Sequence, residues 1–350
     1  MKKSRTVIAT PPGATIKEQL KNRNMSQKEF ALRMDMSEKH ISKLINGEVQ
    51  LTGDVALRLE LVLGIPAHVW NKLEAIYRDK LMRAEAENDM EQDIEESKNY
   101  PYNEMAKNGW VEKTNKPNEK VINLRKFFEV VKLDLIKMTM LDKIACRRLG
   151  DGDRADYALV AWAQKARLEA RDISVKSVNT TRLERNLKKL RYMTNMDPVC
   201  FCPQMKALLA DCGIALVFLP HIGGSFLHGA TFYDGKKIVM GLTVRGRDAD
   251  RFWFSLFHEI GHVLCNHINH MGSTTVDDEI EADDFARDLL IPNEPYRQFI
   301  GNEDFSVTAI TFFAQTIDIA PGIVIGRLQK DGYIGYNQGN RLKIRYALAV

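Results

Sequence analysis

Three residues whose side chains can bind a metal or move a proton stand together in the sequence, at His258, Glu259 and His262. The surrounding segment, from Asp250 to Cys265, is apolar on nearly every face of a helix and therefore predicts a buried helix. Residues four apart lie on one helix face, so both imidazoles can reach one ion while Glu259 leans towards a water bound to it. Two imidazoles and a carboxylate are costly to bury without partners, so this HExxH pattern predicts a Zn²⁺ site.

A catalytic zinc normally has three protein ligands and one open position. The third ligand is expected on the next helix, VDDEIEADDFARDLLIP, which Asp277 or Asp278 can cap. Glu279 lies on the inward stripe of this helix, whereas Glu281 falls on another face. The spacing favours Glu279 as the ligand, and the small Ala282, one turn further, lets the two helices press together.

Two further histidines, His267 and His270, follow the expected end of the HExxH helix at Asn266. Either could be a ligand or a donor that stabilises an anion. Their position beyond the helix end favours exposed loop residues, and we interpret both in that way.

A small β-sheet is expected before the HExxH helix. Residues 213–219 (GIALVFL) form a β-rich run, and Asp234-Gly235 is a two-residue hairpin signal between runs 231–233 and 236–243. His228 and Tyr233 in this region are candidate oxyanion donors, although the role of an ordinary strand residue is favoured for each.

The stretch FWFSLFHEIGHVL...EIEADDFARDLLIP resembles the ImmA/IrrE family of metallopeptidases, whose pattern is HExxH followed by ExEAxxFAxxLLMP. The resemblance implies His258, His262 and Glu279 as ligands of one Zn²⁺ per chain and Glu259 as general base. The sequence departs from the family pattern at Ile291, where Met is usual. It also implies an α+β, gluzincin-like domain that cleaves a repressor or antitoxin in stress or mobile-element control. The chemistry would be metal-assisted amide hydrolysis, with strand 227–232 aligning an extended substrate.

The N-terminal region predicts short helices separated by turns. Ser26 with Glu29 predicts a capping box, and Ser37 caps a following helix that ends at Asn46 and Gly47. Two such helices joined by a short turn form a helix-turn-helix, whose second helix lies in the major groove of DNA. The candidate DNA-binding residues are Gln27, Ser37, Lys39, His40, Ser42 and Lys43.

About 70 residues of this region, from PPGATIKEQL to LVLGIPAHVW, resemble the HigA-type antitoxins within the Xre family of helix-turn-helix regulators. Asp35 stands where the family usually has Gly, and because Asp tolerates a left-handed conformation we expect a strained but intact turn. The resemblance implies a double-stranded DNA operator as partner and binding as a homodimer. A five-helix domain should end near Leu81.

Composition and charge divide the chain further. Residues 1–50 hold ten Lys or Arg against five Asp or Glu, whereas residues 51–100 hold six against eleven. We predict a mainly α protein with a small β-sheet, made of a helix-turn-helix domain (12–82), an acidic helix and linker (83–120), a helical spacer (121–198) and an α+β metallopeptidase domain (199–350).

Five cysteines, no signal segment and no long apolar run favour a cytoplasmic protein without a membrane partner.

Two classes of function follow. The first is a DNA-binding regulator with a zinc endopeptidase domain that acts on a repressor or antitoxin. The second is a non-proteolytic, antitoxin-like repressor whose zinc domain senses a ligand or binds a partner such as a cognate toxin. Self-cleavage within the irregular segment 99–120 is a third possibility.

Overall fold

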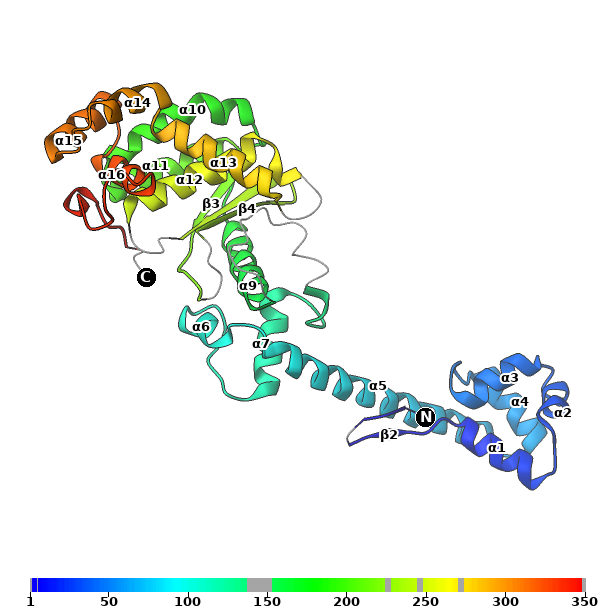
Figure 1. The fold of residues 1–350 in the computed structure, drawn as a ribbon. Helices are drawn as coiled ribbons and strands as arrows, with labels where there is room; N and C mark the ends of the chain where they lie inside the picture. Colours follow the sequence, from blue (N-terminus) through cyan, green and yellow to red (C-terminus); the bar gives the residue numbers. More distant parts are fainter. Residues whose placement is uncertain are drawn as a thin grey trace. The chain divides into compact units, whose positions relative to one another are not determined.

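The computed structural model describes residues 2–4, 6–136, 153–223, 228–243, 248–269 and 274–347. The chain forms two compact units, Met1–Glu95 and Glu96–Val350. Helices dominate both units, and the second contains a small three-stranded sheet (Figure 1). The predicted fold class, mainly α with a small sheet, is confirmed.

The first unit is a helical domain preceded by a short antiparallel strand pair. Its elements are β1 (Lys2–Lys3), β2 (Ile8–Ala9), α1 (Gly13–Asn22), α2 (Gln27–Arg33), α3 (Glu38–Asn46), α4 (Gly53–Leu63) and α5 (Ala67–Ser97). The helices enclose a core in which Ile16, Phe30, Ile41, Leu59 and Trp70 are completely buried. The amphipathic stripes of the sequence therefore meet in one apolar centre.

Serine caps begin the two central helices of this unit. Ser26 accepts a hydrogen bond from the backbone N–H three residues on, and Ser37 does the same at the start of α3. Only this half of the predicted capping box is formed, because the Glu29 carboxylate binds Arg33 at 2.6 Å. Gly47 ends α3 with φ of 75°, as expected for a left-handed C-cap.

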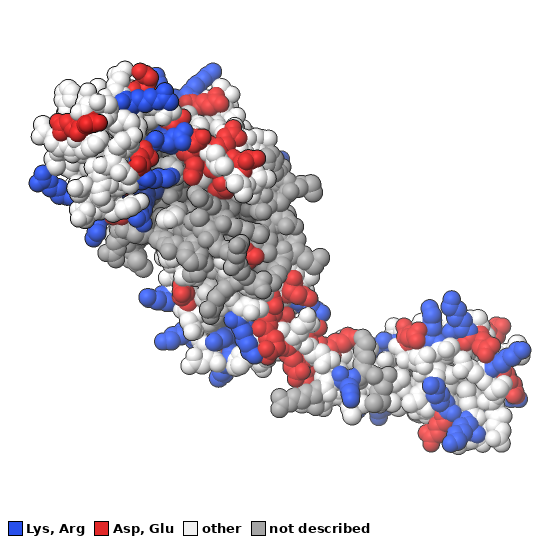
Figure 2. All heavy atoms as spheres, viewed as in Figure 1, with Lys and Arg blue, Asp and Glu red and all other residues white. Residues whose placement is uncertain are grey.

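The helix expected to end near Leu81 instead continues, since α5 runs unbroken from Ala67 to Ser97. Its acidic half contains no Gly or Pro and is rich in good helix formers, so the local charge does not end the helix. Acidic side chains gather there (Figure 2). Glu87 accepts hydrogen bonds from the hydroxyls of Ser4 and Thr6 at 2.5 and 2.7 Å, which ties the N-terminal strands to α5.

The second unit places helices on both faces of its sheet. Its elements are α6 (Tyr102–Lys107), α7 (Pro117–Phe128), α9 (Asp153–Ala170), α10 (Thr180–Tyr192), η2 (Met193–Asn195), α11 (Pro198–Asp211), β3 (Ile214–Phe218), β4 (Gly229–Asp234), β5 (Lys237–Leu242), α12 (Ala249–Leu264), η3 (His267–Asn269), α13 (Val276–Leu290), α14 (Asn293–Gly301), α15 (Val307–Thr316), α16 (Pro321–Lys330) and η4 (Asn340–Leu342). No single helix of the described residues is long and apolar enough to cross a membrane, while α15 and α16 pass that test only as a pair bent by 112°.

The sheet has the order β3-β5-β4, with β3 parallel to β5 and β4 antiparallel to it. Alternate residues face opposite helices, since Met240 joins the core around Trp253 of α12 while Val239 joins the core around Trp162 of α9. The strand order makes β4 an edge strand, and its residues Gly229 and Thr231 lie against Glu259 of α12. The predicted hairpin is present but shifted by one residue, because Asp234 pairs with Lys237 and leaves Gly235 in the turn with φ of 63°.

The segment 99–120, which the sequence marks as an irregular and accessible linker, is folded against the second unit's core. Tyr102, Met105 and Trp110 are buried, and the Tyr102 hydroxyl donates to the carbonyl of Glu112 at 2.6 Å. The buried part of the segment is a poor peptidase substrate, whereas residues 112–118 are mostly exposed and stay accessible to self-cleavage.

Candidate metal centre and nucleic-acid interface

The side chains of His258, His262 and Glu279 converge on one point between α12 and α13. The two Nε2 atoms are 3.0 Å apart, and the Glu279 carboxylate lies 3.3 Å from His258 and 3.5 Å from His262. Ligand atoms about 2.0–2.1 Å from a tetrahedral zinc stand about 3.4 Å from one another, so these spacings fit zinc. Oε2 of Glu279 is buried without a hydrogen-bond partner, an acceptor that a metal ion would satisfy.

Close contact between the two helices brings these ligands together. A Cβ at Gly261 would lie 3.2 Å from the Cα of Ala282, so both positions need small residues, as the sequence predicts for Ala282. Thr275 caps α13 in a reciprocal capping box with Asp278, which corrects the expectation that Asp277 or Asp278 is the cap. Helix α13 therefore starts two or three residues earlier than expected.

Two neighbours orient the ligands. Oδ1 of Asp283 lies 2.8 Å from Nδ1 of His258, and the Thr274 hydroxyl donates to Oε1 of Glu279 at 2.5 Å. A carboxylate on the far ring nitrogen fixes the tautomer that directs Nε2 of His258 towards the metal position.

The pKa values of the two histidines are shifted in opposite directions. Burial lowers the pKa of His258, but the adjacent carboxylates of Asp283 and Glu279 outweigh burial and raise the pKa to about 10. Burial and the charge of His258 lower the pKa of His262 to about 4. A metal ion must therefore displace a proton from His258, so metal binding should weaken as the pH falls.

Glu259 lies under the edge strand rather than among the ligands. It is 3% exposed, and the Thr231 hydroxyl donates to its Oε2 at 2.5 Å. A Cβ at Gly229 would stand 2.6 Å from Oε1 of Glu259, so the strand approaches the carboxylate closely only because this residue is glycine. Burial raises the pKa of Glu259 to about 7, which places a carboxylate that can take and return a proton beside the metal position.

His267 is a buried part of this centre, and its interpretation as an exposed loop residue is wrong. It is 3% exposed in the short helix η3, its Nδ1 lies 2.9 Å from Nδ1 of His262, and its Nε2 lies 3.1 Å from Glu281. If His262 binds a metal through Nε2, its proton is on Nδ1 and is donated to His267, whose own Nε2–H then points to Glu281. His270 lies outside the described residues.

A second group, Cys265, His267 and Glu281, also has ligand atoms within 4.8 Å of one another. Burial, and then the charge of Glu281, raise the pKa of Cys265 to about 11, so the thiol stays protonated and is a poor ligand. The proton on Nε2 of His267 leaves that atom no lone pair for a metal. We interpret this group as the hydrogen-bonded support of His262.

In the first unit, the candidate DNA-binding side chains lie on the exposed side of α2 and α3. Lys39 and Lys43 are exposed, His40 and Ser42 are partly exposed, and Gln27 is the first residue of α2. The Ser37 hydroxyl already accepts a hydrogen bond from the backbone of His40. Basic and acidic side chains are interspersed on the visible face of this unit (Figure 2).

The turn between α2 and α3 has the helix-turn-helix form. Asp35 occupies it with φ of 53°, so the chain keeps the turn with an aspartate in a left-handed conformation. Arg58 of α4 donates to the carbonyls of Met34 and Asp35 at 3.0 and 3.3 Å and so holds this turn on the domain.

Comparison with known proteins agrees with both units. Residues 16–70 match the family described as helix-turn-helix. The uncharacterized HTH-type transcriptional regulator YddM of Escherichia coli (strain K12) is 35% identical over 63 residues, which are 18% of this chain and 67% of that protein. The chain belongs to the helix-turn-helix regulators.

The same regulator contains a peptidase domain. Its residues 252–317, a span that includes both histidines of HExxH and Glu279, match the family described as peptidase U49. This DNA-binding regulator therefore joins a helix-turn-helix domain and a peptidase domain in one chain, which confirms the resemblances inferred from the two sets of motifs.

Sequence reasoning missed Thr231 and Asp283 at the regulator's candidate metal centre, and it named His267 but misplaced it as an exposed loop residue. Asp283 is four residues after Glu279 and so shares its helix face, a signal that the sequence contains. Thr231 shares a face of the edge strand with Gly229, but its contact with Glu259 depends on how the sheet lies on α12. The contact of His267 depends on the turn beyond α12, which residue spacing does not specify.

Proposed function

We propose that this regulator is a zinc-dependent endopeptidase as well as a DNA-binding protein. The observation that carries the proposal is the convergence of three ligand atoms at 3.0–3.5 Å beside the buried carboxylate of Glu259. The match to a peptidase family over the same residues supports it. One Zn²⁺ per chain is the expected cofactor.

A zinc ion held by His258, His262 and Glu279 would act as a Lewis acid on the scissile carbonyl and lower the pKa of a water molecule. Glu259 takes a proton from the attacking water and delivers it to the leaving nitrogen. Thr231 holds the Glu259 carboxylate in place at 2.5 Å, and Asp283 holds His258 at 2.8 Å. The protein thus supplies the proton transfer and the fixed ligand geometry.

The edge strand β4 offers a binding site for an extended polypeptide. It is the outer strand of the sheet and runs beside Glu259, so a substrate strand paired with it would lie next to the metal position. His228 precedes β4 and is partly exposed, and Tyr233, near its other end, is 36% exposed. Both stay candidates for oxyanion stabilisation.

The substrate class is inferred from the combination of domains. We propose that the regulator binds a double-stranded DNA operator as a homodimer in the cytoplasm and cleaves a repressor or antitoxin in stress or mobile-element control. The division into segments 12–82, 83–120, 121–198 and 199–350 is part of this proposal. The alternative is a repressor that binds zinc and a ligand or toxin without cleaving protein, and the helix-turn-helix match is equally consistent with it.

Removal of zinc tests the peptidase. Dialysis against a chelator should abolish cleavage of a repressor encoded beside this gene, and one equivalent of Zn²⁺ per chain should restore it. Cleavage is followed by gel and intact mass. DNA binding by the first unit should not change on chelation. Stoichiometric zinc without cleavage of any neighbouring gene product would favour the non-proteolytic alternative.

The DNA interface has a separate test. We expect the combined change Lys39→Ala and Lys43→Ala to weaken binding to a duplex of about 30 base pairs and to reduce the slope of log affinity against log salt by about 2, because each lysine releases about one counterion. The combined change Lys188→Ala and Lys189→Ala, at two exposed lysines of α10, removes the same charge from the other unit and should leave the slope unchanged. An unaltered slope in the variant without Lys39 and Lys43 would remove α3 from the interface.

A further inference from the structure

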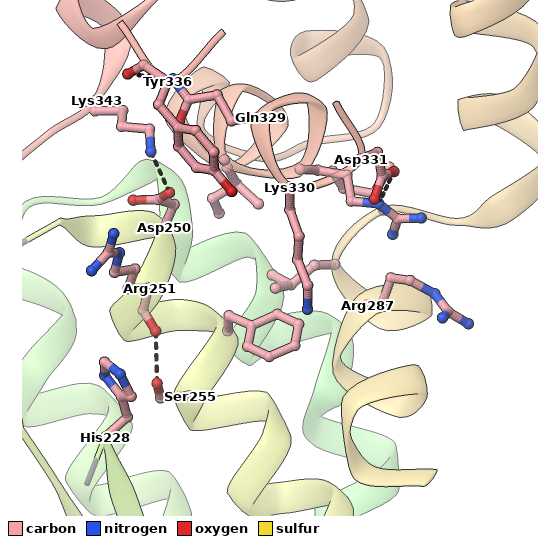
Figure 3. A pocket seen from close by; sticks show the side chains of 16 residues that line it. His228, Asp250, Arg251, Ser255, Arg287, Gln329, Lys330, Asp331, Tyr336 and Lys343 are labelled. Atoms are coloured by element: carbon pink, nitrogen blue, oxygen red, sulfur yellow. Dashed lines mark hydrogen bonds and ion pairs between the residues drawn. The ribbon is translucent and has the colours of Figure 1, made fainter. Parts of the chain in front are cut away.

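A cavity of about 510 Å³ lies in the second unit, between the first turns of α12, the end of α13 and helix α16 (Figure 3). Cavities of this size take small ligands or the side chains of a bound peptide. None of the three proposed metal ligands lines it, so it is separate from the metal position.

Two contacts place this cavity directly beside the metal centre. Phe254 lines the cavity and precedes His258 by one helical turn, with 6.4 Å between the two ring centroids. His228, at the other side of the opening, precedes Gly229, whose backbone lies against Glu259. A polypeptide held at the metal position would therefore extend side chains towards the cavity.

The walls are basic, but most of the charge is internally balanced. Lysine or arginine side chains at five positions face two aspartates, Asp250 and Asp331; the five are Arg251, Arg287, Arg327, Lys330 and Lys343. Lys343 binds Asp250 at 2.7 Å and Arg327 binds Asp331 at 2.5 Å. Arg287 binds Asp288 at 2.7 Å on its own helix. These three basic side chains are therefore neutralised by their aspartate partners and do not attract a further anion strongly.

Lys330 is the basic residue whose charge is not balanced. Its Nζ lies 4.9 Å from the centre of the Phe254 ring, and it has no carboxylate within 4.0 Å among the residues that the structure describes. Figure 3 shows its side chain reaching from α16 into the space between α12 and α13. Arg251 also lines the cavity, but it is paired with Asp248 at 3.8 Å.

We propose that this cavity is a substrate subsite that selects an acidic side chain close to the scissile bond, with Lys330 as the specificity-determining residue. The inference rests on the proposed peptidase function, and it names the class of substrate as polypeptides with Asp or Glu at one position beside the cleaved bond. The aliphatic part of such a side chain contacts Phe254, and its carboxylate pairs with Lys330.

The first experiment uses the zinc-loaded full-length protein and a peptide library made by digesting a bacterial proteome, with the cut sites read by mass spectrometry. Lys330 is exposed, so we expect Asp and Glu to be enriched about two- to fivefold over Asn and Gln at one position. Lys330→Met should remove this preference, and Lys330→Glu should shift it to Lys and Arg. Lys188→Met is the matched control and should keep the wild-type preference.

A second experiment measures binding without hydrolysis. A short alanine-based peptide with one central Glu, and its Gln counterpart, are titrated into the zinc-loaded Glu259→Gln protein. The Glu peptide should bind about two- to fivefold more tightly, and Lys330→Met should remove the difference. Inorganic phosphate is titrated in parallel as a small anion.

The outcomes separate the subsite from the peptidase itself. Glu-selective binding that depends on Lys330, without any hydrolysis by the wild type, supports the subsite and contradicts the peptidase. Hydrolysis with no charge preference at any position, and equal binding of the two peptides, overturns the subsite and leaves the peptidase intact. Phosphate binding that depends on Lys330, with no difference between the peptides, assigns the cavity to a small anion and also overturns the proposal.

Discussion

Replacement of Glu259 by Gln is expected to reduce peptide hydrolysis by about 10²–10⁴-fold while one zinc ion per chain stays bound. The amide cannot take a proton from water, but it keeps the size of the carboxylate under Gly229 and can still accept the hydrogen bond from Thr231. The ligands His258, His262 and Glu279 are untouched. Cleavage rate and zinc content, measured on the same sample, give the comparison.

The pH dependence of the rate follows from the same carboxylate. Burial raises the pKa of Glu259 to about 7 in the metal-free protein, and a zinc ion nearby lowers it again because the cation stabilises the charged form. A general base must be ionised, so activity should fall as the pH drops through a pKa below 7. Residual activity of the Gln variant should lack this acid limb.

The matched control for Glu259 is Glu294→Gln, which makes the same chemical change at an exposed position on α14. It should hydrolyse peptides at the wild-type rate. Full activity in the Glu259 variant would end the proposed mechanism, and loss of zinc from that variant would mean that Glu259 has a structural task at the metal position.

The sequence contained the local parts of this site because they are set by helical spacing. His258 and His262 are one turn apart, and Glu279 was separable from Glu281 by the face of α13 on which it falls. The structure places Glu279 beside both histidines, whereas the Glu281 side chain is 64% exposed and reaches His267. Helical periodicity was sufficient to predict which side chains share a face when all of them lie on the same helix.

Errors arose where an element ends or where two elements meet. The helical pattern suggested that the domain ends near Leu81 and that a separate acidic helix follows, but acidic residues are good helix formers and α5 continues unbroken to Ser97. The hairpin turn moved by one residue because Gly235 is the position that needs a positive φ. His267 was misplaced for the same reason, since its burial depends on a turn that returns the chain towards α13.

His267 provides the second large effect that we expect. His267→Leu should weaken zinc binding by about 10–100-fold, as changes at hydrogen-bond partners of metal ligands typically do. Leucine has a similar bulk in this buried place but cannot accept the proton on Nδ1 of His262, which lies 2.9 Å from Nδ1 of His267. His262 is completely buried, so loss of this acceptor would cost its N–H a hydrogen bond. Zinc affinity is measured by competition with a chromophoric chelator.

His267→Asn distinguishes this positioning role from simple core filling. The Oδ1 of asparagine is bonded to Cγ, as Nδ1 of histidine is, so it can accept from His262 while the contact with Glu281 is lost. We expect the Asn variant to bind zinc within about threefold of the wild type, although it fills the site less well than Leu. Thermal unfolding of the zinc-free proteins reports any damage to the fold. A loss of zinc affinity in the Asn variant that equals or exceeds the loss in the Leu variant would contradict the acceptor role, and a larger loss in Asn would show that His267 acts by volume. Recovery in Asn identifies the acceptor atom as the feature that holds His262 in its metal-binding tautomer.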